Sequence, residues 1–448
     1  MINRIICAAM TAAFVASAST PAPAAKIERL LTPRGLEVWH VRDDTLPMIS
    51  MEFAFRGGSA QDPADKSGLA TMTAALLDEG AGELDARAFQ ERLEGSAIVL
   101  NFSAQRDSMR GSLKTLTEHR AEAIELLRLA LSAPRFDDDA IERIRAGMSA
   151  GIRRRSTNPN EIAGERWFAR AFPNHPYGRP ARGSLDSVAA ISAQDLRALH
   201  RKQFARSNLK IATIGAIDGK DVAELVDKAF AGLPERAELA SVAEAAPQGG
   251  GVRDVVQLDV PQTVITFGGL GLKRADPDFI PAFVLNHILG GGTFTSRLYR
   301  EVREKRGLAY SVYSYLAPLD RSGLFIGGVS TRNDRAAESL AIILEQIRKL
   351  SEEGPSAEEL AKAKSYLIGS YPLRFDNSGK IAGQLLEIQL EELGVDYIDR
   401  RNGLVEAVTA EDVRRAAARF LADSELLVTL VGKPDPAPVQ QPTPGSRG

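Results

Sequence analysis

The chain has 448 residues, of which 44% are hydrophobic and 25% are charged, and its formal net charge is −2. At roughly 150 residues per domain, this length allows two to four domains of ordinary globular composition. The near-neutral charge balance, without a basic block that carries interleaved aromatic residues, argues against a nucleic-acid partner.

The first 25 residues are typical of a cleaved secretory signal. Arg4 precedes an apolar run from Ile5 to Ala18, and the small residues that follow end in Ala22-Pro23-Ala24, as at an A-x-A cleavage site. The apolar run is too short to span a bilayer. We therefore expect residues 1–25 to be a signal peptide, and the mature protein to reach a bacterial periplasm without a membrane span. Cys7 is the only cysteine and leaves with this segment, which excludes thiol and disulfide chemistry from the mature chain.

Comparison of the chain with itself reveals an internal repeat. Segments match at offsets of 212 to 219: 47–53 with 261–267, 76–80 with 288–292, Ile124 and Ile141 with Ile343 and Leu360, and 191–196 with 408–413. We expect two copies of one fold. The predicted organisation is an N-terminal domain at 26–238, a linker at 239–251, a C-terminal domain at 252–434 and a disordered tail at 435–448.

Each copy alternates between two kinds of apolar pattern. Alternating or continuous apolar runs predict strands at 48–55, 210–214, 264–267, 325–329 and 426–430. Helical spacing predicts helices at 120–131, 137–155, 335–350 and 357–370, with Asp137 and Ser356 as N-caps. The predicted fold class is α+β: two tandem homologous domains, each a mainly antiparallel sheet with helices packed on one face. Trp39 and Trp167 are interpreted as core or interface anchors.

The stretch from Gly290 to Tyr315 stands out in the second copy. It begins with three glycines, which let another backbone approach closely: Gly290, Gly291 and Gly292. A helical run is predicted from Ser296 to about Lys305, and Arg303 and Tyr310 flank the turn that follows. A cation, a phenol and bare backbone amides suit a surface that grips a peptide carbonyl. The alternative is an ordinary helix start with solvated arginines.

Several segments together resemble the pitrilysin/insulinase family of zinc peptidases. They are Gly57-Gly-Ser through Gly68-Leu-Ala to Gly80, Pro134-Arg-Phe136 with Glu142-Arg-Ile-Arg145, His175-Pro-Tyr-Gly-Arg-Pro180, and the stretch from Arg303 to Tyr310. The resemblance extends from about residue 27 to 432. In that family an inverted zinc motif, H-x-x-E-H, follows the Gly-Leu-Ala on a helix of the first half.

Placing this motif on the sequence gives a negative result. The two histidines of the family fall at Thr71 and Ala75, the glutamate base at Ala74, and the distal glutamate ligand at Gly151. None of these side chains can bind zinc, and a catalytic zinc site needs three protein ligands and a water. We therefore expect this chain to hold no metal and no other cofactor. The sequence also lacks a G-x-S-x-G elbow for serine chemistry.

The histidines offer no substitute site. They lie at positions 40, 119, 175, 200 and 287, so that no two share one face of a helix at the spacing of a metal motif. His287 falls opposite Ala75 in the repeat, but the other two motif positions there are Phe283 and Asn286. We interpret His287 as a structural or solvent-facing residue.

Two hypotheses for function remain open. In the first, the chain is the non-catalytic subunit of a heterodimeric periplasmic zinc metallopeptidase and lends Arg303 and Tyr310 to the zinc site of a homologous partner subunit, as the resemblance implies. Peptide substrate would then contact Gly290, Gly291, Gly292, Thr293 and Phe294. In the second, the chain is a structural or peptide-binding scaffold without a role in catalysis. Under either hypothesis the neighbouring Arg297, Arg300 and Arg306 are expected to be solvated.

Overall fold

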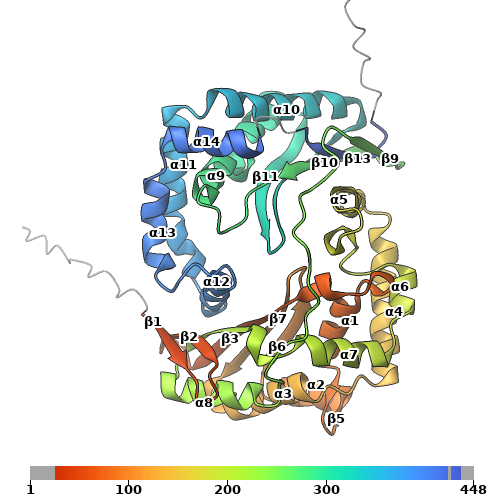
Figure 1. Cartoon of the computed structure of the whole chain (residues 1–448), viewed down its shortest axis with the longest axis vertical. Coiled ribbons are helices and arrows are strands. Elements are labelled where there is room, and N and C mark those ends of the chain that lie inside the picture. The colour runs from red at the N-terminus through yellow and green to blue at the C-terminus, as the bar shows by residue number, and fades with distance from the viewer. Residues whose placement is uncertain (1–25, 422–424, 435–448) are drawn as a thin grey trace, which may run out of the picture.

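The computed structural model of the chain describes residues 26–421 and 425–434, so the predicted signal segment and tail lie outside the described residues. The described part forms two halves, each built on one sheet, joined by a connecting segment (Figure 1). Within those described ranges, no helix combines the length and the apolar character needed to cross a bilayer.

The first half contains a six-stranded sheet in the order β1-β2-β8-β3-β7-β6, in which only β2 and β8 run parallel. Its strands are β1 (Ile27–Leu31), β2 (Glu37–Arg42), β3 (Met48–Arg56), β6 (Val99–Ala104), β7 (Ser108–Leu116) and β8 (Leu209–Gly215), and β4 (Gly80–Ala81) and β5 (Leu84–Asp85) form a separate pair. Its helices are α1 (Leu69–Leu76), α2 (Ala86–Gly95), α3 (Arg120–Ser132), α4 (Asp138–Arg155), α5 (Pro159–Ala171), α6 (Leu185–Ala189), α7 (Ala193–Gln203) and α8 (Gly219–Phe230).

The second half contains a five-stranded sheet in the order β11-β12-β10-β13-β9, in which only β13 and β9 run parallel. Its strands are β9 (Arg253–Gln257), β10 (Gln262–Leu270), β11 (Ala309–Leu319), β12 (Ser322–Arg332) and β13 (Leu427–Gly432). Its helices are α9 (Phe279–Asn286), α10 (Ala336–Glu353), α11 (Ala357–Gly369), α12 (Ser378–Leu390), α13 (Tyr397–Glu406) and α14 (Ala410–Phe420). The predicted α+β class, with two homologous halves on mainly antiparallel sheets, is confirmed.

The repeat extends to individual cross-strand pairs. Phe53 of β3 lies opposite Gly111 of β7, and Phe267 of β10 lies opposite Gly327 of β12. A Cβ at either glycine would come within 2.1 Å of the facing phenylalanine ring, so both positions must be glycine for the ring to lie over the strand. Both sheets therefore pack a phenylalanine ring over a glycine of the neighbouring strand, although few of their other residues are identical.

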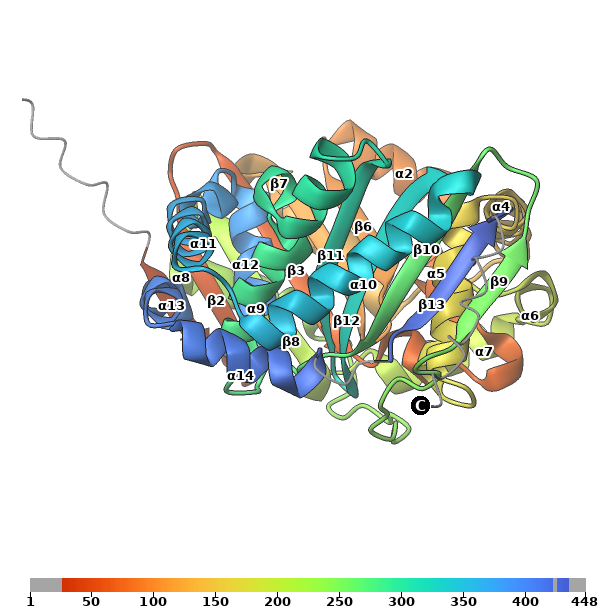
Figure 2. The same ribbon diagram turned by 90° about the horizontal axis from the view of Figure 1, so that it is seen from above.

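One face of each sheet carries its own helices. In the first half, α3 and α8 bury Ile124, Leu127, Val226 and Phe230 against the sheet. In the second half, α10 and α14 lie over the equivalent face, as the view from above shows (Figure 2), and their apolar residues join Phe267 and Phe325 in one core. This burial of the helices' apolar stripes supplies the main driving force for each half.

The opposite faces are covered by an exchange of helices between the halves. Helix α12, from the second half, packs on β3 and β8 of the first sheet, and α5, from the first half, packs on β10 and β13 of the second (Figure 1). Trp39 joins α12 in one apolar cluster, and the Trp167 indole on α5 donates a hydrogen bond of 3.1 Å to the carbonyl of Leu427. Both tryptophans are thus interface anchors, as predicted. The exchange itself has no signature in the sequence, because periodicity identifies the apolar face of a helix and not the sheet that receives it.

The predicted helix starts are right, but only one of the two caps forms. Ser356 caps α11 in a reciprocal arrangement with Glu359. Asp137 precedes α4 without a capping hydrogen bond, because its carboxylate accepts from Arg135 at 2.6 Å instead. The predicted helix at 296–305 is present around π-helical turns at Tyr299–Glu304.

Candidate functional site

The positions of the family's zinc motif lie on two helices of the first half that pack together, α1 and α4. The Thr71 hydroxyl donates a hydrogen bond of 2.8 Å to the carbonyl of Ala181, while Ala74 and Gly151 are buried and Ala75 is partly buried. Among the described residues, no group of three or more His, Cys, Asp or Glu side chains could hold a metal ion. The donor set at α1 and α4 therefore does not fit zinc.

The guanidinium group of Arg155 lies beside Gly151, the position of the family's distal glutamate ligand. A Cβ at Gly151 would come 3.2 Å from Nη1 of Arg155, one turn further along α4. The Nε atom of Arg155 is buried without a hydrogen-bond partner in the described structure. Burial raises the pKa of the nearby Glu165, and the charges of Arg155 and Arg182 oppose that rise. This centre thus carries permanent positive charge, which disfavours a metal cation.

The three glycines of the second half lie at the end of α9, where a π-helical turn spans His287–Gly291. None of the three has a positive φ angle, so close packing explains them better than backbone conformation. A Cβ at Gly290 would come 2.5 Å from the Ser314 hydroxyl and 2.7 Å from its backbone nitrogen. The predicted close approach of a backbone is therefore confirmed for Gly290, and the approaching backbone is the protein's own strand β11.

The loop that follows the glycines projects outward. Thr293 has a φ of 43°, which is a strained conformation for a β-branched residue. The next residue, Phe294, is 66% exposed, and its ring packs edge-to-face on Tyr299 with 5.1 Å between ring centres. An exposed aromatic ring on a strained loop is a feature of contact surfaces rather than of cores.

The side chains of Arg303 and Tyr310 lie in contact, and their paired role stays a prediction. The guanidinium carbon of Arg303 lies 4.6 Å from the centre of the Tyr310 ring and 4.8 Å from that of Tyr299, and Arg303 also donates a hydrogen bond to the Tyr299 hydroxyl. Tyr310 is 82% exposed and is the second residue of β11, the edge strand of the second sheet. Within the described residues Arg303 forms no ion pair, so two aromatic rings alone hold its charge in place.

The prediction that the neighbouring arginines are solvated is wrong for Arg297. Its side chain is 11% exposed and binds both carboxylate oxygens of Glu359, at 2.8 and 2.7 Å, tying the loop helix to α11. Arg306 donates to Glu301 at 2.8 Å. Arg300 is 42% exposed and closest to the expected state. Because Arg297 supports the local fold, it is unsuitable as a neutral control for Arg303.

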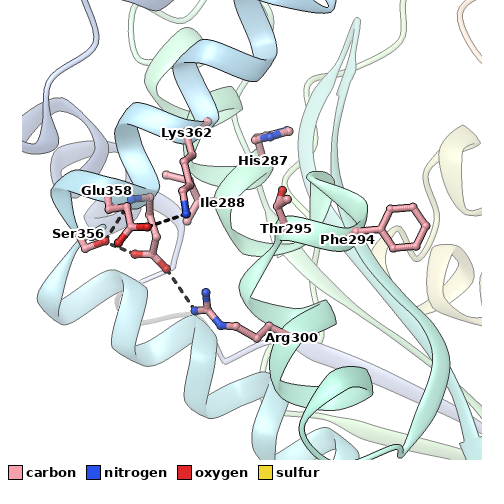
Figure 3. Close-up of a pocket in the computed structure, with 10 residues that line it drawn as sticks. His287, Ile288, Phe294, Thr295, Arg300, Ser356, Glu358 and Lys362 are labelled. Atoms are coloured by element: carbon pink, nitrogen blue, oxygen red, sulfur yellow. Dashed lines mark hydrogen bonds and ion pairs between the residues drawn. The ribbon is translucent and has the colours of Figure 1, made fainter.

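His287 lines a pocket of about 460 Å³ beside the glycine loop (Figure 3). It is 7% exposed, so of the two alternatives expected from the sequence, a structural or a solvent-facing histidine, the solvent-facing one is wrong. Its ring stacks on Tyr366 with 5.0 Å between centres, and burial lowers the pKa of the imidazole, which keeps it neutral. The adjacent Asn286 has a structural role, since its side chain bonds to both the backbone carbonyl (3.2 Å) and the hydroxyl (2.8 Å) of Ser314.

Two family models match the chain: Insulinase (Peptidase family M16) over residues 40–184 and Peptidase M16 inactive domain over residues 190–367. A Helicobacter pylori protein named non-peptidase homolog YmxG is 30% identical over 332 residues, which make up 73% of this chain and 76% of that protein. The chain belongs to the insulinase family, peptidase family M16.

Further M16 relatives match over nearly the whole chain. A solved structure of a peptidase M16 inactive domain from Pseudomonas fluorescens has a TM-score of 0.86 at 30% identity and covers 92% of this chain and 98% of that one. The mitochondrial-processing peptidase subunit beta of Blastocladiella emersonii is 24% identical over 421 residues, or 92% of this chain and 89% of that protein. The family resemblance predicted from the sequence is therefore confirmed for both halves.

Within the M16 family this chain is an inactive member, because all four positions of its zinc motif carry residues that cannot bind the metal. Sequence reasoning missed three residues of this M16 chain. Tyr299 is signalled only by its spacing of four residues before Arg303. Arg155 is likewise one helical turn after Gly151, but the direction of a long side chain cannot be read from spacing. Glu359 meets Arg297 only through the tertiary fold. The substrate-binding role of residues 290–294 stays a prediction.

Proposed function

We propose that this chain is the non-catalytic subunit of a heterodimeric periplasmic zinc metallopeptidase. It would pair with a homologous subunit that bears the zinc, and present Arg303 and Tyr310 to peptide substrate bound at the partner's site. The observation that carries the proposal is the contact between these two side chains, which leaves an almost fully exposed phenol beside a cation that no carboxylate in the described structure neutralises.

The chemistry of the pair supports a role toward a peptide carbonyl. A phenol can donate a hydrogen bond to the oxyanion that develops as the carbonyl is attacked, and a guanidinium can hold a substrate carbonyl or carboxylate. Tyr299 contributes by fixing Arg303, since it accepts a hydrogen bond from the guanidinium and stacks beneath it. Orientation before reaction is what makes such donors effective.

Among its described residues, the first half of the same chain supplies no zinc site to which Arg303 and Tyr310 could contribute. The α1 and α4 helices lack zinc ligands and hold Arg155 at the position of the distal ligand. Under this proposal the reactive centre comes from another chain. The relative named as a subunit of the mitochondrial-processing peptidase supports this inference, because its name places that protein in an assembly.

The sheet edge beside the pair suits an extended peptide. Strand β11 has no neighbour on one side of the described sheet, and Tyr313 and Tyr315 stack along it with 6.2 Å between ring centres. Extended peptides bind such edges through backbone hydrogen bonds. The proposed substrate class is therefore a peptide that passes from the exposed edge to Tyr310.

The decisive test reconstitutes the chain with a zinc-bearing M16 homologue and measures peptide turnover. We expect Tyr310→Phe or Arg303→Ala to lower turnover by a factor on the order of 10²–10³, with zinc content and assembly unchanged. Arg348→Ala on the exposed side of α10 is the matched control and should keep turnover within about twofold.

Two outcomes would contradict the proposal. If Tyr310→Phe in an intact complex turns over substrate within about twofold of wild type, the phenol does not stabilise the transition state. If the chain associates with no zinc-bearing homologue under mild salt, the alternative of a structural or peptide-binding scaffold is favoured instead.

A further inference from the structure

The pocket beside the glycine loop has a built polar wall whose groups are not all satisfied (Figure 3). It lies between the π-helical turn at His287–Gly291, the loop at Thr293–Thr295 and the first turns of α11. Its volume of about 460 Å³ exceeds what one water requires and is sufficient for a peptide side chain.

One of the cations around the pocket, Arg300, lacks a close carboxylate partner among the described residues, although the carboxylates of Glu358 and Glu359 also line the wall. Arg297 binds Glu359 through both oxygens, Lys362 binds Glu358 at 2.6 Å, and Lys305 and Arg306 share Glu301 at 2.6 and 2.8 Å. Arg300 has only long contacts left, 3.5 Å to Glu359 and 3.7 Å to Glu301, and both of those carboxylates already have closer partners. A guanidinium that borders a pocket with only such long contacts is available to an anion.

His287 supplies the second observation. It lines the same pocket and is 7% exposed, and its ring makes no hydrogen bond to any described residue. An imidazole without a protein partner that borders a cavity has a ring donor and a ring acceptor free to meet a ligand in that cavity. Because its pKa is lowered by burial, the ring is neutral and keeps one N–H donor. The amino-terminal end of α11, a helix of 13 residues, adds a favourable dipole for negative charge.

We propose that this pocket binds a peptide carboxylate, either an Asp or Glu side chain or the C-terminal carboxylate. The Arg300 guanidinium would form a two-pronged bond to the carboxylate, and the His287 N–H would donate to the same group. Phe294 lines the pocket, and its ring packs on Tyr299, which holds Arg303. A single residue, Tyr299, thus lies between the pocket wall and the pair formed by Arg303 and Tyr310. The choice of a peptide as ligand rests on the proposed function, whereas the carboxylate chemistry does not.

The test measures binding to the mature chain alone, without a partner or turnover. Three short fluorescein-labelled peptides of Ala and Leu are titrated by fluorescence anisotropy: one with a central Asp and an amidated end, one with Asn and an amidated end, and one with Asn and a free end. We expect at least one carboxylate peptide to bind about tenfold more tightly than the neutral amide. The first and third peptides distinguish a side-chain carboxylate from a terminal one.

Two variants assign that preference to the pocket. Arg300→Gln should reduce the preference to about twofold or less, and Arg300→Lys should retain part of it, because the charge remains but the two-pronged geometry is lost. His287→Gln should weaken the carboxylate peptide by several-fold and leave the neutral one unchanged. Arg348→Gln is the matched control on an exposed helix, and thermal melts report the folding of each variant.

Equal affinity for the neutral and carboxylate peptides would overturn the proposal. A carboxylate preference that persists in Arg300→Gln would place the binding elsewhere and would overturn it as well. The result is independent of catalysis. If Tyr310→Phe leaves turnover unchanged while the carboxylate preference holds, the function proposed for the pair fails and the pocket stands.

Discussion

Two helix ends that the repeat makes equivalent have diverged in opposite directions. In the first half, α1 presents small side chains toward α4, and Arg155 supplies a positive charge beside Gly151. In the second half, α9 carries Asn286 and His287 at the positions of Ala74 and Ala75, and ends beside a polar pocket. The zinc-binding side chains of the family are thus absent at one helix end, while the equivalent end in the other half carries an amide and an imidazole. A repeated backbone does not fix which copy carries reactive groups.

The backbones of the two helix ends differ as well. Helix α1 ends at Leu76, and the backbone N–H of its C-cap Leu77 donates to the carbonyl of Ala74. Helix α9 instead continues into a π-helical turn at His287–Gly291, with Gly292 as the C-cap of that turn. Turns of this kind are often found at functional sites, because they shift the side chains that follow out of the helical register. The two equivalent helix ends therefore differ in main chain as well as in side chains.

The largest expected effect is on zinc content, when the family's zinc ligands are restored to the first half. We expect the variant Thr71→His, Ala74→Glu, Ala75→His and Gly151→Glu to remain far below one zinc per chain, because the new glutamate would meet Arg155. Adding Arg155→Ala should raise the zinc content several-fold, toward one per chain, as measured by metal analysis after gel filtration. Arg154→Ala, one residue earlier and exposed, is the matched control.

Stoichiometric zinc in the four-residue variant with Arg155 intact would show that this guanidinium moves aside without penalty. No zinc in either variant would indicate that the contacts that support metal ligands have also been lost.

The sequence predicted the parts of this structure that depend on local pattern and repetition. The offsets of 212 to 219 gave the two halves, and apolar runs gave the strands near Met48 and Val264. The loss of zinc ligands was equally readable, because it concerns residue identity alone. What could not be predicted depends on side-chain direction and on docking between distant elements. Tyr299 beneath Arg303, and the exchange of α5 and α12 between the sheets, are two such features.

The glycines at the end of α9 provide the next prediction. Gly290→Ala would place a Cβ 2.5 Å from the Ser314 hydroxyl and 2.7 Å from its backbone nitrogen, so strand β11 must shift. We expect a loss of about 1–3 kcal/mol in the free energy of unfolding, measured with urea. Gly383→Ala on α12, where nothing lies within 4 Å of the new Cβ, should be neutral or stabilising. An unchanged stability in Gly290→Ala would mean that the loop and strand adjust freely.

The smallest expected effect concerns the two sheet faces that are covered by the exchanged helices α12 and α5. Glu52 on β3 lies under the exchanged helix α12, whereas the equivalent residue under α5 is Thr266 of β10. Burial raises the pKa of Glu52 to about 7, Arg110 opposes this rise and Glu387 adds to it. The carboxylate of Glu387 is itself paired with Arg110. The first half therefore carries an acid at a position where the second half carries a neutral hydroxyl.

The sign of the pH dependence follows from this asymmetry. A carboxyl whose pKa is raised on folding binds protons more readily in the folded state, so its ionisation destabilises the fold as pH rises from about 5 to 8. We expect Glu52→Gln to remove part of this loss. Its free energy of unfolding should exceed that of wild type by about 1 kcal/mol at pH 8 and by little at pH 5, and the figure at pH 8 is already reduced for the partial exposure of Glu52. Urea unfolding at both pH values measures it, and Glu345→Gln on the exposed side of α10 serves as the control. If Glu52→Gln gained the same stability at both pH values, the shape of the Glu52 side chain and not its charge would account for the destabilisation beneath α12.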